Sequence, residues 1–119
     1  MKTWQEAWDW AVAECDAWNR RDLQSIMSHY ADDVALSSPV VVTRMGRADG
    51  WLHGKADVRD YFAISLQAPG LHFELLDVLF GVNVICMIFR RETGATVCDV
   101  FELDDQDRVK RLLAARARP

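Results

Sequence analysis

The stretch from Trp18 to Pro39, WNRRDLQSIMSHYADDVALSSP in one-letter code, decides how the rest of the chain must fold. Asn19 tolerates the left-handed conformation that often ends a helix. Asp22 is a good N-cap for a new helix, which is predicted from Leu23 to about His29. Residues Val34 to Ser38 are predicted as a short strand. The stretch therefore predicts a helix end, a tight corner, a short helix and the first strand.

The residues before this corner predict one long helix. Thr3 and Glu6 have the spacing of a capping box, in which each side chain satisfies a backbone amide at the start of the helix. Apolar residues then recur at the helical period; they are Trp4, Trp8, Ala11, Val12, Cys15 and Trp18. Together with a neighbouring line of apolar residues, they make the helix apolar over a broader arc than one core face needs.

Residues 40–53 are predicted to form a long loop, because glycines interrupt them. Within this loop, Trp51 and Leu52 are expected either to fold back as a lid or to dock on a partner chain. A third helix is predicted from Lys55 to Gln67, since Pro69 and Gly70 then stop it.

The second half of the chain predicts antiparallel strands. The apolar alternation changes phase inside the segment from Leu71 to Phe80, which predicts a bent strand with a β-bulge near Leu75–Leu76. Three further strands are predicted at Val84–Arg91, Ala95–Leu103 and Arg108–Arg116, each separated by a turn. Helices followed by a meander of strands form an α+β pattern. We therefore expect one domain over residues 1–119, with a cone-shaped, curved antiparallel or mixed sheet wrapped around three N-terminal helices and enclosing a pocket.

Composition narrows the classes of function. The net charge of -4 argues against a nucleic-acid-binding surface, and the basic residues between Lys110 and Arg118 are expected on the solvated side of a strand. Cys15, Cys86 and Cys98 lie in apolar runs without paired spacing, which predicts buried thiols in a reducing compartment. No apolar run approaches the roughly 20 residues that span a bilayer. We expect a soluble cytoplasmic protein that binds neither nucleic acid nor membrane.

Five motifs occur in a recognisable order along the chain: Ala17–Leu23, Tyr30–Val34, Ser38–Pro39, Gly54–Phe62 and Val100–Leu103. This order resembles the nuclear transport factor 2-like superfamily, in particular its SnoaL-like and ketosteroid-isomerase-like members. The superfamily hosts isomerases, cyclases, dehydratases, epoxide hydrolases and non-catalytic binding modules, so the resemblance is specific for a fold and not for a reaction. It implies a homodimer formed through the outer face of the sheet.

The steroid isomerases of this superfamily use three pocket residues, and the resemblance carries them over one at a time. A tyrosine on the first helix and a protonated aspartate on a late strand hold the oxyanion, and an aspartate before a proline moves the proton. The late-strand acid corresponds to Asp99, which precedes Val100–Phe101 as in the family. The tyrosine falls on Glu14, and the aspartate before the proline falls on Ser38. One of the three residues is thus kept.

Asp99 is also a candidate on physical grounds. Strand alternation places it on the same face as Phe101 in apolar surroundings, which would raise the pKa of its carboxyl group. If Thr93–Gly94 forms a two-residue hairpin turn, Ile88 lies opposite Asp99 and Arg90 lies within reach of it on the same face. Two interpretations remain open: an acid that lines a pocket, or a structural aspartate–arginine pair at the rim of the sheet.

Glu14 lies on one helical face between Trp10 and Trp18, four residues away on either side. It is either a helix-surface residue beside exposed tryptophans or a pocket acid with a raised pKa. In the second case, Glu14 and Asp99 would face one cavity and share a proton, with one acting as acid and the other as base.

We therefore expect a domain that binds a small, mostly apolar and cyclic molecule, without a cofactor and without a metal site. If it is an enzyme, Asp99 and Glu14 are the catalytic residues of an isomerisation, cyclisation or dehydration of a cyclic, polyketide-like or steroid-like substrate. The substrate-binding candidates are Trp10, Trp18, Ser38, Tyr61, Ser65, Arg90 and Phe101. The alternative is a non-catalytic ligand-binding or dimerisation module. A third interpretation, an epoxide hydrolase-like Asp–Arg–Asp site, has only Asp99 and Arg90 as candidates.

Overall fold

The computed structural model describes residues 1–117 and contains one six-stranded mixed sheet. The strands are β1 (Tyr30–Ser37), β2 (Trp51–His53), β3 (Phe73–Gly81), β4 (Val84–Arg91), β5 (Thr96–Leu103) and β6 (Val109–Arg116). They lie in the order β2-β1-β6-β5-β4-β3, and the sheet does not close on itself. Strands β1 and β6 are parallel, and all other neighbours are antiparallel. The predicted α+β fold with a mixed sheet is confirmed.

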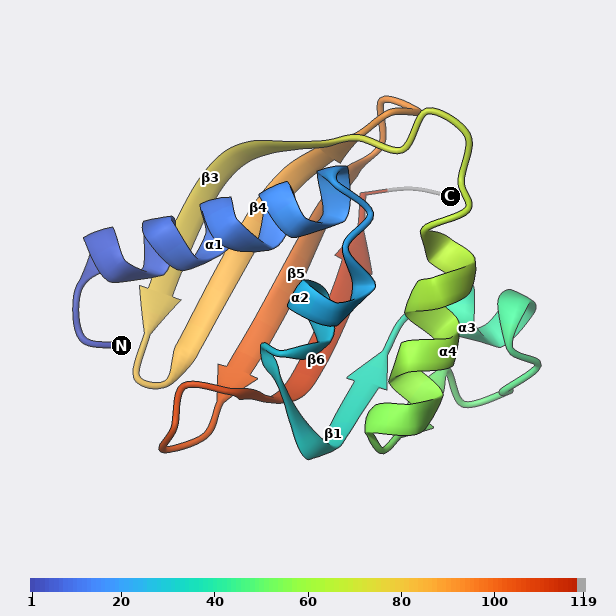
Figure 1. Cartoon of the computed structure of the whole chain (residues 1–119), viewed down its shortest axis with the longest axis horizontal. Coiled ribbons are helices and arrows are strands. Elements are labelled where there is room, and N and C mark those ends of the chain that lie inside the picture. Colours follow the sequence, from blue (N-terminus) through green and yellow to red (C-terminus); the bar gives the residue numbers. More distant parts are fainter. Residues whose placement is uncertain (118–119) are drawn as a thin grey trace.

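The helices lie on one side of the curved sheet (Figure 1). They are α1 (Trp4–Asn19), α2 (Leu23–Met27), α3 (Pro39–Arg44) and α4 (Lys55–Ser65). Helix α1 crosses the sheet over β3 and β4 and packs mainly against β3, and α4 packs beside β1 at the other end of the sheet.

Local chemistry explains where the first two helices begin. The Thr3 side chain accepts a hydrogen bond from the backbone amide of Glu6 at 3.1 Å, and Asp22 accepts one from the amide of Ser25 at 3.2 Å. Both are N-cap contacts that satisfy amides left free at a helix start, and both caps were predicted. The corner between the helices places Arg21 in the left-handed region, with φ at 56°.

The secondary structure of residues 40–53 was predicted wrongly. Instead of a continuous loop, they contain helix α3, which begins after the N-cap Ser38 and has Pro39 in its first turn. They also contain strand β2, where Trp51 pairs with Ser37 of β1. The segment around Trp51 is thus an edge strand and not a lid. Valine-rich sequence after an N-cap and a proline is helical here because the cap and the fixed proline φ favour a helix start over a strand.

The bulge in β3 is confirmed, because Leu75 pairs with Phe89 while Asp77 pairs with Ile88, which leaves Leu76 without a partner on β4. The core lies on the helix side of the sheet, where α1 contributes Ala7, Ala11 and Trp18. No helix in residues 1–117 is long and apolar enough to cross a membrane.

The predicted register of the β4–β5 hairpin was wrong by one residue. Arg91 donates to the carbonyl of Ala95 at 2.8 Å, and Gly94 donates back to the carbonyl of Arg91 at 2.9 Å. The connection therefore has three residues, with Gly94 at a φ of 88°, which is the usual three-residue hairpin with glycine in the left-handed position. A slip of one residue moves every side chain of a strand to the other face. Arg90 accordingly lies on the outer face, and Arg91 lies on the helix side.

The cysteine prediction was correct for one of the three residues. Cys15 of α1 is buried in the core, and burial raises the pKa of its thiol to about 12. Cys86 and Cys98 are only half-buried, because strand alternation places them on the outer face of the sheet. Because its pKa is so high, the Cys15 thiol is inert at neutral pH.

Candidate functional site

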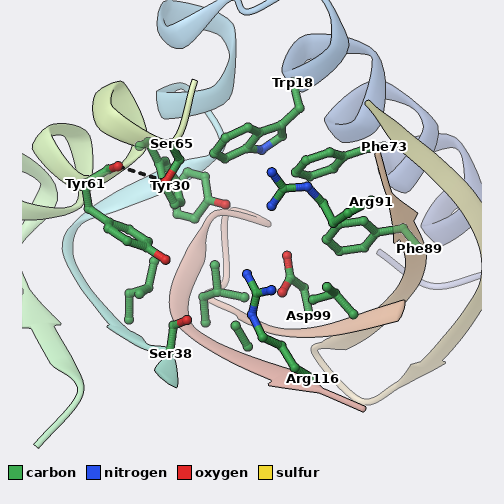
Figure 2. Close-up of a pocket in the computed structure, with 15 residues that line it drawn as sticks. Trp18, Tyr30, Ser38, Tyr61, Ser65, Phe73, Phe89, Arg91, Asp99 and Arg116 are labelled. Atoms are coloured by element: carbon green, nitrogen blue, oxygen red, sulfur yellow. Dashed lines mark hydrogen bonds between the residues drawn. The ribbon is translucent and has the colours of Figure 1, made fainter. Parts of the chain in front are cut away.

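A small cavity of about 60 Å³ lies on the helix side of the sheet, between the C-terminal end of α1, helix α4 and strands β1, β4, β5 and β6. Aromatic rings form a large part of its wall: Trp18, Tyr30, Tyr61, Phe62, Phe73 and Phe89. Aliphatic side chains complete the apolar part: Leu36, Val97, Leu112 and Ala114. Its polar groups belong to Ser38, Ser65, Arg91, Asp99 and Arg116 (Figure 2). The site is thus an apolar pocket with a few polar groups, the usual composition of a small-molecule site.

The aromatic wall on the α1 side is a continuous stack. Trp18 lies parallel to Phe73, with ring centroids 5.1 Å apart, and Phe73 stacks on Phe89 at 4.4 Å. The ring of Phe62 meets Trp18 edge-on at 4.9 Å. Such contacts restrict the rings to single orientations, so this wall is a preformed surface for an apolar or planar group.

Asp99 is the acid of the pocket. It stands on β5 opposite Met87 of β4 and Ala114 of β6, so neither of these paired residues offers it a charge. Burial raises the pKa of its carboxyl group to about 7, and the negative charge of Glu14 adds to the increase. The positive charges of Arg116 and Arg91 act in the opposite direction. Near neutral pH, Asp99 can therefore both donate and accept a proton.

Two arginines reach the cavity from the strands on either side of Asp99. The guanidinium of Arg91 forms a bidentate pair with Glu92, with N···O distances of 2.9 and 3.2 Å, and lies 5.1 Å from the ring centroid of Phe73. Arg116 has its Nε atom buried with no hydrogen-bond partner among the described residues. In Figure 2 the guanidinium of Arg116 lies beside the carboxylate of Asp99, and that of Arg91 lies at the same end of the pocket, toward Trp18. The pocket thus has a positively charged end.

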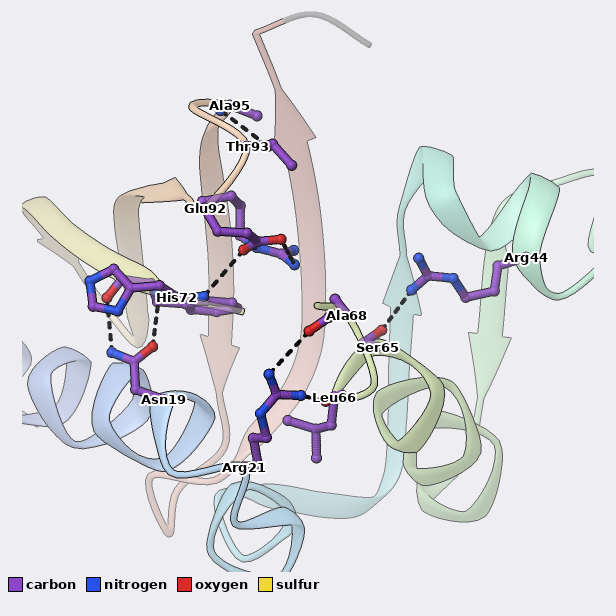
Figure 3. A network of polar contacts seen from close by, with 12 residues as sticks. Asn19, Arg21, Arg44, Ser65, Leu66, Ala68, His72, Glu92, Thr93 and Ala95 are labelled. Atoms are coloured by element: carbon purple, nitrogen blue, oxygen red, sulfur yellow. Dashed lines mark hydrogen bonds and ion pairs between the residues drawn. The ribbon is translucent and has the colours of Figure 1, made fainter. Parts of the chain in front are cut away.

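The opposite side of the cavity carries hydroxyl groups that already have protein partners. Ser38 accepts a hydrogen bond from the amide of Val40 at 3.2 Å, as the cap of α3. Ser65 donates to the carbonyl of Tyr61 at 3.0 Å and accepts from Arg44 at 2.9 Å (Figure 3). These contacts hold α3 and α4 together beside the pocket, which is a structural use of both serines.

Glu14 is completely buried but lies behind the cavity wall. Its carboxylate accepts a hydrogen bond from the hydroxyl of Tyr30 at 3.3 Å, and its other oxygen lies 3.5 Å from Nδ1 of His29. The hydrogen bond with Glu14 raises the pKa of His29, and burial raises that of Tyr30 well above its usual value. Tyr30 therefore stays neutral and separates Glu14 from the pocket. Glu14 influences the cavity only through its negative charge and through its hydrogen bond with the hydroxyl of Tyr30.

Of the residues predicted as a site, five line the cavity: Trp18, Ser38, Tyr61, Ser65 and Asp99. Trp10 of α1 packs on Phe101 of β5, with ring centroids 4.8 Å apart, so both belong to the core. Arg90 is on the outer face, where it pairs with Glu74 at 3.1 Å. Its expected contact with Asp99 was wrong, because the hairpin register differs by one residue.

The sequence analysis missed several residues that line the cavity: Tyr30, Phe73, Phe89, Arg91 and Arg116. Gly94 is the signal that could have identified Arg91, since glycine in the third position favours a three-residue hairpin. Alternation along β6 could have identified Arg116, because Leu112 and Arg116 are four residues apart and share a face. The expectation that the basic residues of this segment are all solvated was thus wrong for Arg116.

Comparison with known proteins finds one family and many structures of the same fold. The family model described as a SnoaL-like domain matches residues 11–112. A crystal structure of a SnoaL-like protein of unknown function from Burkholderia thailandensis is 37% identical, covers 98% of each chain and superposes with a TM-score of 0.92. No match was found among curated proteins.

More distant structures share the fold and differ in the activities proposed for them. A protein from Kribbella flavida that is provisionally named a ketosteroid isomerase is 16% identical, with a TM-score of 0.75 over 97% of this chain and 80% of its own. A provisionally named polyketide cyclase from Sinorhizobium meliloti is 15% identical, with a TM-score of 0.71 over 87% of this chain and 90% of its own. At this level of identity the likeness concerns the fold alone.

Proposed function

This chain belongs to the SnoaL-like family, and from that premise we propose that it binds a small carbonyl compound and catalyses a cofactor-free proton transfer on it. The observation that carries the proposal is Asp99, an acid in an apolar pocket whose carboxyl pKa is raised to about 7. A general acid–base catalyst is most effective when its pKa lies near the working pH. Asp99 combines this pKa with direct access to the cavity.

The pocket supplies the groups that such a reaction needs. The carboxylate of Asp99 would remove a proton from the carbon next to a carbonyl group, and the electron pair of that C–H bond would move to the carbonyl oxygen as an enolate. Arg91 and Arg116, which also line the cavity, would stabilise the negative oxygen. The protonated Asp99 would then return the proton to the same or to another carbon. Isomerisation, cyclisation and dehydration can each begin with this enolate.

Glu14 has an indirect part in this proposal. Because it is buried behind Tyr30, it cannot touch a ligand in the cavity. Its negative charge nevertheless raises the pKa of Asp99, which keeps that carboxyl group partly protonated near neutrality. Glu14 is thus a positioning and tuning residue, and Asp99 alone transfers the proton.

The volume of the cavity favours a small substrate. Ligand pockets for drug-sized molecules measure roughly 300–1,000 Å³, whereas this cavity measures about 60 Å³. The parallel rings of Trp18 and Phe73 favour a planar or single-ring compound. We therefore propose ring ketones and hydroxy-ketones as the first substrates to test.

A non-catalytic binding module is the second candidate, and one observation favours it. The hydroxyl groups of Ser38 and Ser65 are already engaged by the protein, so Asp99 is the one acid among the residues that line the described cavity. A pocket with one acid can bind a carbonyl compound without converting it. The test below separates the two functions.

The test is the exchange of α-hydrogens for deuterium in cyclopentanone, cyclohexanone and 2-hydroxycyclohexanone, followed by NMR in D2O. We expect the protein to accelerate the exchange and Asp99→Asn to lose about 10²- to 10⁴-fold of that acceleration, the usual contribution of a general base. Asp105→Asn is the matched control, because Asp105 is exposed in the turn before β6. Exchange that is unchanged in Asp99→Asn would contradict the catalytic proposal, and ligand binding without exchange would favour the binding module.

A further inference from the structure

The positively charged end of the pocket is not explained by proton transfer alone. Arg91 comes from β4 and Arg116 from β6, the two strands that flank Asp99 on β5. Both guanidinium groups lie at the end of the pocket that holds Asp99, with Arg116 beside its carboxylate (Figure 2). The enolate oxygen of the proposed reaction carries one negative charge, whereas the two guanidinium groups carry two positive charges, so the pair exceeds what that oxygen requires.

The charges at this end do not balance when Asp99 is protonated. The charge of Arg91 is offset by Glu92, at an N···O distance of 2.9 Å. Arg116 has no carboxylate within ion-pair distance among the described residues, and its Nε atom is buried without a hydrogen-bond partner. An arginine stays charged at any physiological pH, and Arg116 is half-buried with a buried Nε donor that has no partner among the described residues, which is unfavourable. When Asp99 is protonated, the site can therefore accept one further negative charge.

We propose that the ligand of this pocket carries a carboxylate group, which binds between the guanidinium groups of Arg116 and Arg91 while its apolar part lies against the rings of Phe73 and Phe89. Guanidinium groups bind carboxylates through paired, charge-assisted hydrogen bonds. The inference rests on the proposed use of the cavity as a small-molecule site, and it narrows the substrate class to small keto acids or cyclic carboxylic acids.

A carboxylate in this position couples ligand binding to proton uptake. It would lie close to Asp99, and two adjacent carboxylates do not both ionise readily. Binding therefore raises the proportion of protonated Asp99, whose carboxyl group can donate a hydrogen bond to the ligand; the remaining ionised form is the one that removes a proton in the proposed reaction. The other titratable or charged groups around Asp99 come from each packed element: Glu14 and Cys15 of α1, His29 behind Glu14, Tyr30 of β1, Arg91 and Glu92 at the end of β4, and Arg116 of β6.

The test compares carboxylic acids with their primary amides by isothermal titration calorimetry. The probes are isobutyrate, cyclopentanecarboxylate and benzoate, each against its amide, at pH 6 and pH 8. We expect at least one acid to bind about 10-fold or more tightly than its amide at pH 6 and to bind more weakly at pH 8. Titrations in buffers with different ionisation enthalpies should show uptake of up to one proton per ligand at pH 8.

Paired variants on the same strands control for folding and for general charge effects. Arg116→Gln and Arg91→Gln should lose the preference for the acid, whereas Arg111→Gln and Arg90→Gln should keep it, because these neighbours pair with Glu102 and Glu74 outside the pocket. Arg116→Lys, which keeps the charge, should lose less than Arg116→Gln. Thermal unfolding of each variant checks that the fold is retained.

Asp99→Asn provides a separate readout of the proton coupling. Its amide can still donate a hydrogen bond but cannot ionise, so binding of the acid should no longer weaken between pH 6 and pH 8. Equal binding of acid and amide, absence of acid binding, or loss of the preference in the Arg90 and Arg111 variants would each overturn the carboxylate site. These outcomes are independent of deuterium exchange into neutral ketones, so the two proposals can fail separately.

Discussion

Two carboxylates lie between the helices and the sheet, Glu14 on α1 and Asp99 on β5, and their surroundings differ. Glu14 is completely buried and has two side-chain partners, the hydroxyl of Tyr30 and the ring of His29. Asp99 lines a cavity, and burial and Glu14 raise the pKa of its carboxyl group to about 7. The same type of group is thus placed once inside a polar network and once at an open space.

This difference assigns a structural role to Glu14 and a chemical role to Asp99. The Glu14 carboxylate accepts a hydrogen bond from Tyr30 on one oxygen and lies 3.5 Å from the His29 ring on the other, which holds it in one position between helix and sheet. The burial of Asp99 and the charge of Glu14 outweigh the nearby positive charges of Arg116 and Arg91, so the carboxyl pKa of Asp99 stays raised and this group can exchange a proton with a ligand. We therefore expect substitutions of Glu14 to affect stability most, and substitutions of Asp99 to affect activity and the pH dependence of stability.

The largest effect on stability is expected for Glu14→Ala. It leaves the hydroxyl of Tyr30 and the ring of His29 without their buried partner, which typically costs about 3–5 kcal/mol for a broken buried pair. Urea unfolding at pH 7 measures the change. Asp16→Ala is the control, because Asp16 is exposed on the same helix. A loss for Glu14→Ala no greater than that of the control would break the comparison between the two carboxylates.

A smaller effect of opposite sign is expected for Asp99→Asn. The pKa of Asp99 is about 7 in the folded protein and near the ordinary aspartate value of 3.8 when unfolded, so the folded state binds more protons between these two values. The free energy of unfolding should therefore fall as the pH rises from about 4 to 7. Asp99→Asn removes this fall and should be more stable than the wild type at pH 8, by up to about 4 kcal/mol, since one pKa unit corresponds to about 1.4 kcal/mol.

Urea unfolding between pH 4 and pH 8 tests that expectation for both proteins. The difference in unfolding free energy between Asp99→Asn and the wild type should grow through this interval and level off above pH 7. A difference that is constant with pH would mean that Asp99 titrates alike in the folded and unfolded states.

The sequence predicted the order of the elements well, because the signals are local. Caps such as Thr3 and Asp22, and the phase change that marks the bulge at Leu76, depend only on neighbouring residues. The region of residues 40–53 failed because its strand-forming valines compete with an N-cap and a proline. Propensity alone does not decide between these signals.

The site was predicted less completely, because it depends on register and depth. Asp99 follows from strand alternation, but the choice between Arg90 and Arg91 depends on whether the hairpin loop has two or three residues. Likewise, Glu14 and Trp10 lie on the inner side of α1, yet only three-dimensional packing shows that Tyr30 and Phe101 separate them from the cavity. Sequence periodicity predicts the face of a helix or strand on which a residue lies. It does not predict which neighbouring side chain covers that residue.

The central claim is that Asp99 is the proton-transferring group of an apolar pocket, and its most direct test is the pKa of that carboxyl group. Carbon-13 NMR of aspartate-labelled protein between pH 3 and pH 9, with the Asp99 signal assigned from its loss in Asp99→Asn, measures it. The predicted result is a midpoint at about 7, with a lower midpoint in Glu14→Gln, since that substitution removes the charge that helps to raise it. A midpoint near 4, the ordinary value for an aspartate, would contradict the account.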